Sequence, residues 1–166
     1  MGALLGVGIF LGAFAVLPEP AAGASDQGDP ALDYVLQCQG CHLPDASGVA
    51  SAGVPRLAGA VGRFLGVAGG RSYLVQVPGV AQAPLSDAAL ARLLNWLLLR
   101  FSAEELPEPF VPYTASEVSR HRRGPPLDVV ATRRALLAEI QGSIAEAPSS
   151  PRVGEENAAG PDRSSR

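Results

Sequence analysis

A single five-residue segment, Cys38-Gln39-Gly40-Cys41-His42, contains both cysteines of this 166-residue chain and one of its two histidines. Thiols three residues apart can lie on one turn of a helix, where they can add to the two vinyl groups along one edge of a haem. The histidine that follows can then present its imidazole to the iron. This segment therefore predicts one covalently bound haem c, attached through Cys38 and Cys41, with His42 as the proximal iron ligand.

Three other uses of the two cysteines fit their surroundings less well. A thioredoxin-like redox pair usually lies at a helix N-terminus after a strand, whereas the sequence before Cys38 has a helical pattern. A structural zinc site needs four ligands, but this chain has two Cys and two His, and His121 lies far away in an Arg-rich segment. A disulfide between residues so close in sequence is rarely useful. Haem attachment is the prediction that the segment supports best.

The first residues have the composition of an export signal. Residues 3–17 form an uncharged apolar run, Pro18 ends it, and Ala22-Gly23-Ala24 offers the small residues of a cleavage site. The run is shorter than the ~20 residues of a membrane span, and no basic residue precedes it. We expect residues 1–24 to be a signal peptide or, if uncleaved, an N-terminal anchor that holds the protein at a membrane. Both predict a periplasmic or otherwise exported protein, which agrees with haem attachment outside the cytoplasm.

The rest of the chain divides into three predicted parts. We expect a compact helical domain over residues 25–102. We expect a helical extension over residues 103–147, with a Pro-rich linker that Phe110 and Tyr113 anchor. Residues 148–166 have almost no large apolar side chains and predict a disordered tail. The expected fold class is all-α: a small helical domain wrapped around one haem, followed by a C-terminal helical extension. The net charge of −3 does not favour a nucleic-acid partner.

Capping residues and apolar spacing predict two helices in the domain. Asp29 can cap a helix that starts with Pro30, and this helix carries a short apolar stripe of Leu32, Val35 and Leu36. A second helix begins near Ser86-Asp87, and its apolar positions have the i, i+3, i+4, i+7, i+8 spacing of a buried face. These positions are Leu90, Leu93, Leu94, Leu97 and Leu98. Between the two helices, the Gly-rich residues 40–70 are expected to be mostly loop.

Two more helices are expected in the extension. Thr114 and Glu117 have the spacing of a capping box, and Pro125 and Pro126 end the helix that follows. The apolar positions expected in the last helix are Leu127, Val130, Leu137, Ile140 and Ile144. Two interpretations of this apolar face stay open: it packs on the domain, or it docks a partner protein.

Two segments that follow the motif are spaced as in a known family. Pro55-Arg56-Leu57-Ala58-Gly59 comes thirteen residues after His42, and residues 77–87 precede a helix that contains Trp96. Together with the helix before Cys38, these segments resemble the small class I c-type cytochromes over residues 29–101. The resemblance implies that the Pro55 carbonyl accepts a hydrogen bond from His42 Nδ1, which would orient the imidazole. It also implies that Trp96 packs the last helix of the domain across the first.

The resemblance breaks at the distal iron ligand. The family usually has Met before Pro in this loop, whereas Val77 precedes Pro78 here and the one Met of the chain is Met1. A valine side chain has no lone pair and cannot bind iron. We therefore predict an iron whose sixth position is vacant or filled by water. The alternative ligands are side chains that carry a lone pair: His121, Tyr73, Tyr113 and Gln76.

The expected function follows from the haem and from the polarity of its distal side. The distal loop offers apolar side chains, among them Val75, Val77 and Val80, and no acid or base for peroxidase-like catalysis. The first prediction is therefore a non-enzymatic electron carrier, either an exported monohaem protein or the haem subunit of an exported dehydrogenase, with redox proteins as partners. The second is a protein that binds or senses a small ligand at an open distal side. The third is a mainly structural subunit of an exported complex, docked through the extension.

Overall fold

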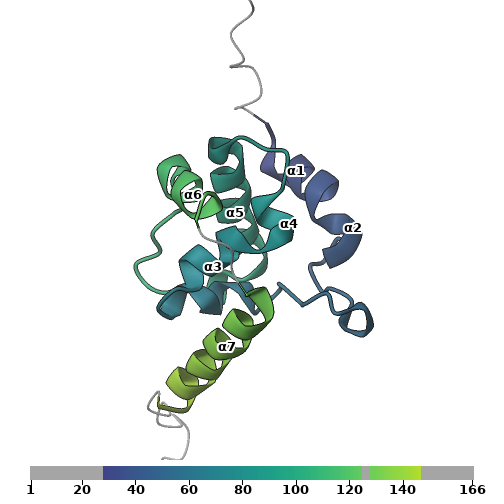
Figure 1. The fold of residues 1–166 in the computed structure, drawn as a ribbon. Coiled ribbons are helices and arrows are strands. Elements are labelled where there is room, and N and C mark those ends of the chain that lie inside the picture. The colour runs from purple at the N-terminus through teal and green to yellow at the C-terminus, as the bar shows by residue number, and fades with distance from the viewer. Residues whose placement is uncertain (1–27, 125–127, 147–166) are drawn as a thin grey trace, which may run out of the picture.

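The computed structural model describes residues 28–124 and 128–146 (Figure 1). Within these ranges the regular structure is helical, and Val49 and Val54 add one isolated antiparallel bridge. The all-α fold class is confirmed. The expected signal or anchor in residues 1–24 and the expected tail in residues 148–166 lie outside the described residues. Among the described helices, none combines the length and the apolar character that a membrane crossing requires.

Seven α-helices follow one another along the described chain, with three short 3₁₀ helices between them. In chain order the α-helices are α1 (Pro30–Gln37), α2 (Gln39–His42), α3 (Gly70–Gln76), α4 (Pro78–Ala81), α5 (Asp87–Phe101), α6 (Ala115–Arg122) and α7 (Val129–Glu146). The 3₁₀ helices are η1 (Ala50–Ala52), η2 (Val61–Gly66) and η3 (Ala103–Glu105). The Gly-rich stretch therefore contains two short 3₁₀ helices within its loops.

Helix α1 begins as predicted but buries a different face. Its cap is Asp29, whose carboxylate accepts a hydrogen bond from the Ala31 amide at 2.9 Å. The expected stripe is wrong, because Leu32, Val35 and Leu36 are 49–65% exposed. The buried residue is Tyr34, which lies two positions from Leu32 and from Leu36 and so, at 3.6 residues per turn, on another face of the helix. A hydrophobic stripe in so short a helix is weak evidence for its inner face.

Helix α5 is the central element of the core. Ser86 caps it by accepting a hydrogen bond from the Ala89 amide at 3.1 Å. The five predicted leucines are all buried, and each contributes on the order of 2 kcal/mol of burial free energy. The ring of Trp96 lies 5.7 Å from that of Tyr34 and 5.6 Å from that of Phe101, measured between centroids. Trp96 therefore packs α5 against α1, as expected.

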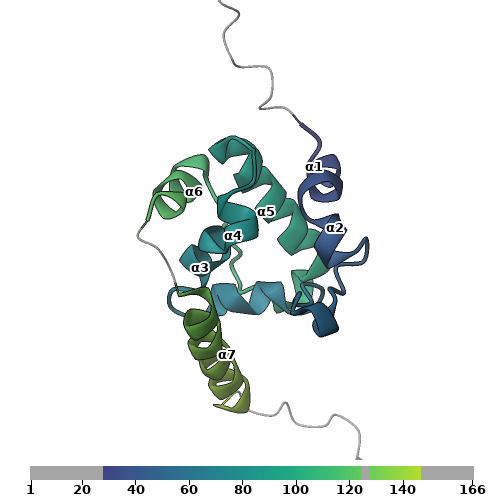
Figure 2. The ribbon, with the colours of Figure 1, turned by 45° about the vertical axis from the view of Figure 1, so that its right-hand side comes forward.

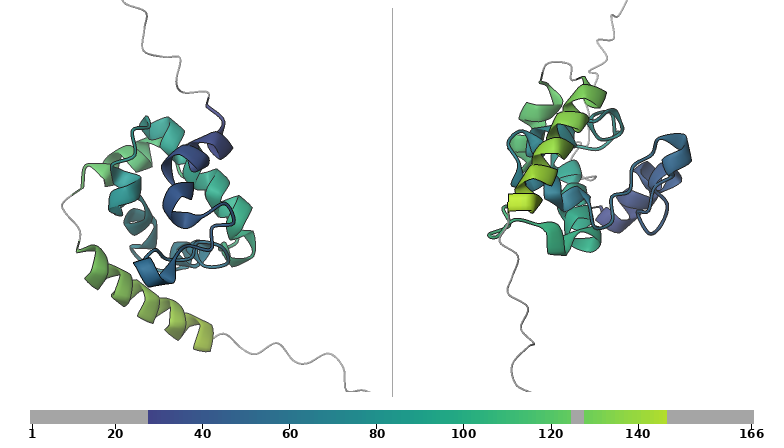
Figure 3. Two further views of the ribbon diagram at one scale, coloured as in Figure 1. Left: turned by 90° about the vertical axis from the view of Figure 1, so that its right-hand side faces the viewer. Right: turned by 90° about the horizontal axis from the view of Figure 1, so that it is seen from below.

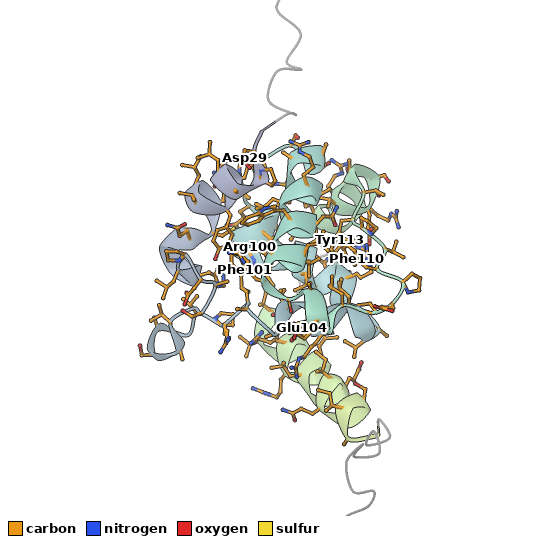
Figure 4. All side chains as sticks on the ribbon, turned by 180° about the vertical axis from the view of Figure 1, so that it is seen from behind. Asp29, Arg100, Phe101, Glu104, Phe110 and Tyr113 are labelled. Carbon is orange, nitrogen blue, oxygen red and sulfur yellow. The ribbon has the colours of Figure 1, made fainter. Side chains whose placement is uncertain are left out.

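The linker and α6 are held against the body by polar contacts. Tyr113 is buried, and both its backbone groups pair with the Asn95 side chain, at 2.7 and 3.0 Å. Figure 4 shows Phe110 and Tyr113 together on this linker. Thr114 Oγ1 accepts a hydrogen bond from the Glu117 amide at 3.2 Å, and the Glu117 carboxylate binds the Arg71 guanidinium through two bonds of 2.8 Å. Helix α6 thus packs on α5 and α3.

Helix α6 ends at Arg122, and the two prolines expected to end it, Pro125 and Pro126, lie outside the described residues. Helix α7 then packs on η2 and α3, with Leu136 and Ile140 buried. The predicted face of α7 is wrong in part. Ile144 is exposed because the last turns of α7 run beyond the other helices (Figure 1), and Val130 is exposed in the first turn of the helix. Leu127, also expected on this face, lies outside the described residues.

Candidate functional site

The five-residue motif lies at the junction of two helices. Cys38 ends α1 and precedes α2, and its carbonyl accepts hydrogen bonds from the amides of Cys41, at 3.2 Å, and His42, at 2.9 Å. The two thiols and the imidazole therefore share one helical turn. Both thiols are free, with Cys38 half-buried and Cys41 exposed.

The surroundings of Cys38 do not favour thiol–disulfide chemistry. Burial, with smaller contributions from Asp33 and Cys41, raises the pKa of the Cys38 thiol to about 11. Reactive cysteines of redox pairs have lowered pKa values and usually lie at a helix N-terminus after a strand. Here the preceding element is the helix α1. The thiol is therefore protonated at neutral pH.

A single backbone carbonyl fixes the orientation of His42. The Nδ1 atom lies 3.0 Å from the Pro55 carbonyl oxygen. Since a carbonyl can only accept, Nδ1 carries the proton and donates, which leaves the lone pair on Nε2 for a metal. Burial lowers the pKa of His42, while this hydrogen bond opposes the shift. The imidazole is thus neutral, as a metal ligand requires, and the contact that the family resemblance implies is present.

The loop that presents Pro55 depends on a glycine. The amide of Gly48 donates to the His42 carbonyl at 3.0 Å, and the bridge between Val49 and Val54 closes the loop. Gly48 has φ +67°, and a Cβ atom there would lie 2.5 Å from the Pro55 carbonyl oxygen. Any other residue at this position would displace the carbonyl that holds His42. The position therefore needs glycine both for its backbone conformation and for space.

A cavity of about 610 Å³ opens beside the motif. Cys38, Cys41 and His42 line it together with Pro55 and Leu57; we call residues 37–57 its proximal side. Residues from η2, α3, α4, α5 and α7 complete the lining. We call the walls formed by α3, α4 and α7 its distal side, and we include α6, which packs behind this wall on α3. Figure 2 shows α1 and α2 on one side of the molecule, with α3, α4 and α7 across from them.

The cavity fits a large apolar cofactor. Its volume lies within the range of about 300–1,000 Å³ that is usual for such sites. Its walls contain many apolar side chains, among them Val61, Phe64, Leu74, Leu94 and Leu97. Two thiols and one neutral imidazole enter it from the same helical turn. These are the groups that covalent haem attachment and iron ligation need.

The distal wall of the cavity is mainly apolar. Val77 and Val80, at the start and within the short helix α4, line it together with Leu74. Of the predicted alternative ligands, Tyr73 also lines the cavity, and its ring stacks on that of Phe64 at 5.4 Å.

The other three alternative ligands are not brought to the cavity in the described structure: His121, Tyr113 and Gln76. His121 lies on α6. The hydroxyl of Tyr113 donates to the Arg71 carbonyl at 2.9 Å, and burial raises its pKa far above the ordinary range. This tyrosine is therefore committed to packing the linker.

Arg122 holds the distal loop, residues 77–87, in place through contacts that the sequence does not predict. Its guanidinium donates to the carbonyls of Ala81, Ala83 and Leu85 at 2.8–3.0 Å, and to the Asp87 carboxylate at 3.1 Å. Hydrogen bonds from Ser119 and then Arg122 lower the pKa of Asp87. In the sequence, Arg122 belongs to a charged run that is typical of a solvated face. Its partners are 35 to 41 residues away, so no local pattern could reveal them.

Helix α7 is the second contribution that sequence reasoning missed. The cavity lining includes Val129, Val130, Arg133, Arg134 and Leu137. The extension was expected either to pack on the domain or to dock a partner. Its last helix does pack on the domain, through η2 and α3, and it also forms part of the cavity wall. Val129, Arg133 and Leu137 have the i, i+4, i+8 spacing that places side chains on one face of a helix. The arginine in the middle of this stripe made the face look polar, so the spacing did not suggest a cavity wall.

Comparison with known proteins gives relatives of one kind. No family model matches the chain. The chain is 32% identical over 130 residues to a cytochrome c-552 of Thermus thermophilus, an alignment that spans 66% of this chain and 98% of that protein. A second cytochrome c-552 of the same species matches at the same identity over 86% of its length.

Proposed function

The chain belongs to the c-type cytochromes, and on that premise we propose that it is an electron carrier, not an enzyme, with one covalently bound haem. Cys38 and Cys41 form the two thioether links, and His42 binds the iron through Nε2. When bound, the haem supplies the one-electron couple of its iron. The chain attaches the haem, orients the imidazole and keeps water from the apolar walls of the cavity.

The hydrogen bond between His42 Nδ1 and the Pro55 carbonyl is the observation that carries this proposal. It fixes one tautomer of a neutral imidazole in the wall of a cofactor-sized cavity, one residue from an exposed thiol. A histidine used only for packing would not need its second nitrogen left free toward such a cavity. Ligating histidines in metalloproteins usually donate their other N–H to a carbonyl or a carboxylate in this way.

Extraction with acidified organic solvent tests the covalent links. Haem should stay with the wild-type polypeptide after denaturation, and mass spectrometry should show one haem per chain. Haem that leaves with the solvent would contradict the proposal. Cys38→Ala and Cys41→Ala should each weaken retention. His42→Ala should keep the links but lose the spectrum of an imidazole-ligated iron, which separates attachment from ligation.

We assign the chain to the class I cytochromes without the usual distal Met. Three observations support this assignment: the Val77-Pro78 pair, the absence of Met after residue 1, and the apolar residues Val77 and Val80 in the cavity wall. The thioether of a Met ligand raises the reduction potential, so its loss should lower it. The sixth position is accordingly vacant or held by water.

The Val77-Pro78 pair also favours a second candidate function, the binding or sensing of a small ligand at the iron. A distal side without a strong protein ligand should let the ferrous protein bind carbon monoxide readily. If His121 were the sixth ligand, binding should be slow or absent, and His121→Ala should restore it. A difference spectrum with and without carbon monoxide distinguishes these cases.

The cellular setting and the domain division are further parts of the proposal. Residues 1–24 export the protein, as a cleaved signal or as a membrane anchor, because haem is attached outside the cytoplasm. Residues 25–102 form the haem domain, residues 103–147 the extension and residues 148–166 a dispensable tail. The partners are redox proteins, and an exported dehydrogenase is one candidate. Co-purification of the full chain from its host tests this last point.

A further inference from the structure

One part of the cavity is cationic, and it belongs to the extension. The lining contains three arginines, Arg56, Arg133 and Arg134, and no Asp or Glu among the described residues. Two of these arginines lie on adjacent positions of α7, where Arg133 is half-buried and Arg134 is exposed. An apolar cavity with a cationic rim fits a ligand that is apolar over most of its surface and carries carboxylates at one edge.

The two arginines of α7 have no acidic partner within the described residues. The arginines that form ion pairs in this part of the chain include Arg71, Arg122 and Arg123. The guanidinium of Arg133 instead lies 5.8 Å from the centre of the Phe64 ring. Arg56, by contrast, is engaged with its own loop, since its Nε donates to the Ala58 carbonyl at 2.8 Å.

The position of α7 relative to the two cysteines decides which part of a haem these arginines can meet. The thiols come from the α1–α2 junction, and the view from below in Figure 3 shows that junction and α7 on different sides of the molecule. The vinyl groups and the propionate groups of a haem leave opposite edges of the ring. Attachment at Cys38 and Cys41 therefore leaves the propionates toward the side of the cavity away from α2.

We propose that Arg133 and Arg134 bind the carboxylates of the haem propionates, so that α7 is part of the haem site and not a docking arm. This inference rests on the proposed function. A guanidinium presents paired N–H donors that match a carboxylate. A cationic pair on one helix can thereby keep both propionates ionised next to apolar walls.

Other charged and titratable groups that face α7 are accounted for. Helix α7 packs on η2 and α3, which carry Arg63, Arg71 and Tyr73. Arg63 lines a separate, smaller cavity with Glu105, and Arg71 is bound by Glu117. Tyr73 lines the haem cavity, where its ring stacks on that of Phe64. On α7 itself, Glu139 is exposed. Within the described residues, Arg133 and Arg134 are thus the available cations on this side of the cavity.

The test is the pH dependence of the midpoint potential, which needs no redox partner. The potential falls with rising pH where a propionate loses its proton, and a nearby cation moves that transition to lower pH. In the double variant Arg133→Gln/Arg134→Gln, the transition should move up by about one pH unit or more. The double Lys variant keeps both charges and should stay near wild type. Arg120→Gln, which removes an exposed charge on α6, is the matched control and should leave the transition unchanged.

Each outcome decides for or against the proposal. A transition in the double Gln variant that matches the Arg120→Gln control would overturn it. So would a variant that changes only the salt dependence of the reaction with a redox protein, because the arginines would then serve an acidic partner. If the double variant does not fold, the single variant Arg134→Gln decides, because an exposed side chain can be replaced without loss of the fold. An upward shift in the pH of its transition supports the proposal, and no shift overturns it. Loss of haem from the wild-type chain on extraction would instead contradict the proposed function.

Discussion

The proximal and distal sides of the cavity differ in how far along the chain their contacts reach. On the proximal side, the Cys38 carbonyl binds amides within one helical turn, and His42 reaches Pro55 only 13 residues away. On the distal side, Arg122 binds carbonyls 37 to 41 residues away, and Arg71 meets Glu117 across 46 residues. The proximal side is a local motif, whereas the distal side is held by contacts with the extension, far along the chain.

This difference implies that the two sides should fail in different ways. A change on the proximal side should alter the iron ligand while most of the fold remains. A change in the extension should first cost stability, and through stability it should alter the distal wall. Substitutions and truncations on either side can test this division.

Removal of the extension should cost most. Truncation after Phe101 exposes the surface that four buried side chains cover: Tyr113, Val118, Leu136 and Ile140. Their burial contributes on the order of 6 kcal/mol or more, which is comparable to the whole stability of a small domain. We expect a large fall in the melting temperature of the haem-loaded protein, or no cooperative transition. Deletion of residues 148–166 is the control and should change neither the melting temperature nor the spectrum.

Arg122→Ala should have the next largest effect. It removes the donors from three carbonyls of the distal loop and from Asp87. We expect a loss of about 3 kcal/mol in the free energy of unfolding, measured by denaturant titration. Arg122→Lys should recover little of it, because one ammonium cannot reach these acceptors together. Equal losses for Arg122→Ala and for Arg120→Ala, on the exposed side of α6, would show that the distal loop does not depend on this contact.

A matched pair of glycines tests the proximal side. Gly48→Ala would place a Cβ 2.5 Å from the Pro55 carbonyl oxygen, whereas a Cβ at Gly69, with φ +80° and outside the cavity lining, would meet nothing within 4 Å. Both variants lose about 1–2 kcal/mol to a left-handed alanine. Only Gly48→Ala should also shift the spectroscopic signature of the proximal imidazole. A signature shifted equally in both variants would mean that Pro55 does not orient His42.

The ion pair between α3 and α6 should make a small contribution that depends on pH. The hydrogen bond from Arg71 holds the pKa of Glu117 below its ordinary value. The stabilisation of the fold by this ion pair is therefore fully present above the pKa of Glu117 in the unfolded chain, about 4.3. It is lost as the pH falls through the lower pKa of Glu117 in the folded protein. Thermal unfolding between pH 7 and acid pH should show that Glu117→Gln costs about 1 kcal/mol at neutral pH. The cost should shrink toward acid pH, and a cost that grows there would contradict the assignment.

The sequence predicted a feature correctly where the residues that determine it are close together along the chain. Asp29, Ser86 and Thr114 could be identified as caps because a cap acts on the next turn of its own helix. The buried leucines of α5 could be identified because its fifteen residues are long enough for a stripe to repeat. The stripe of α1 and part of that of α7 were wrong, because burial there depends on which neighbour covers the helix. That neighbour is set by tertiary contacts and not by spacing.

The same reasoning explains what was missed at the site. The motif predicts its own geometry, and the bond from His42 to Pro55 spans one short loop. The roles of Arg122, Arg133 and Arg134 depend on where α6 and α7 pack, 80 to 92 residues after the motif. An arginine in a charged run looks solvated until its partners are known. Long-range polar contacts of this kind carry no local signature.

The ferric absorption spectrum tests most directly whether the iron takes its strong protein ligand from the proximal side alone. The wild-type protein should lack the charge-transfer band between a thioether sulfur and iron, and Val77→Met should introduce it if the loop can bring sulfur to the metal. A thioether band in the wild-type protein would contradict the assignment of the distal side. A low-spin ferric spectrum that His121→Ala abolishes would contradict it as well, because both axial ligands would then be histidines.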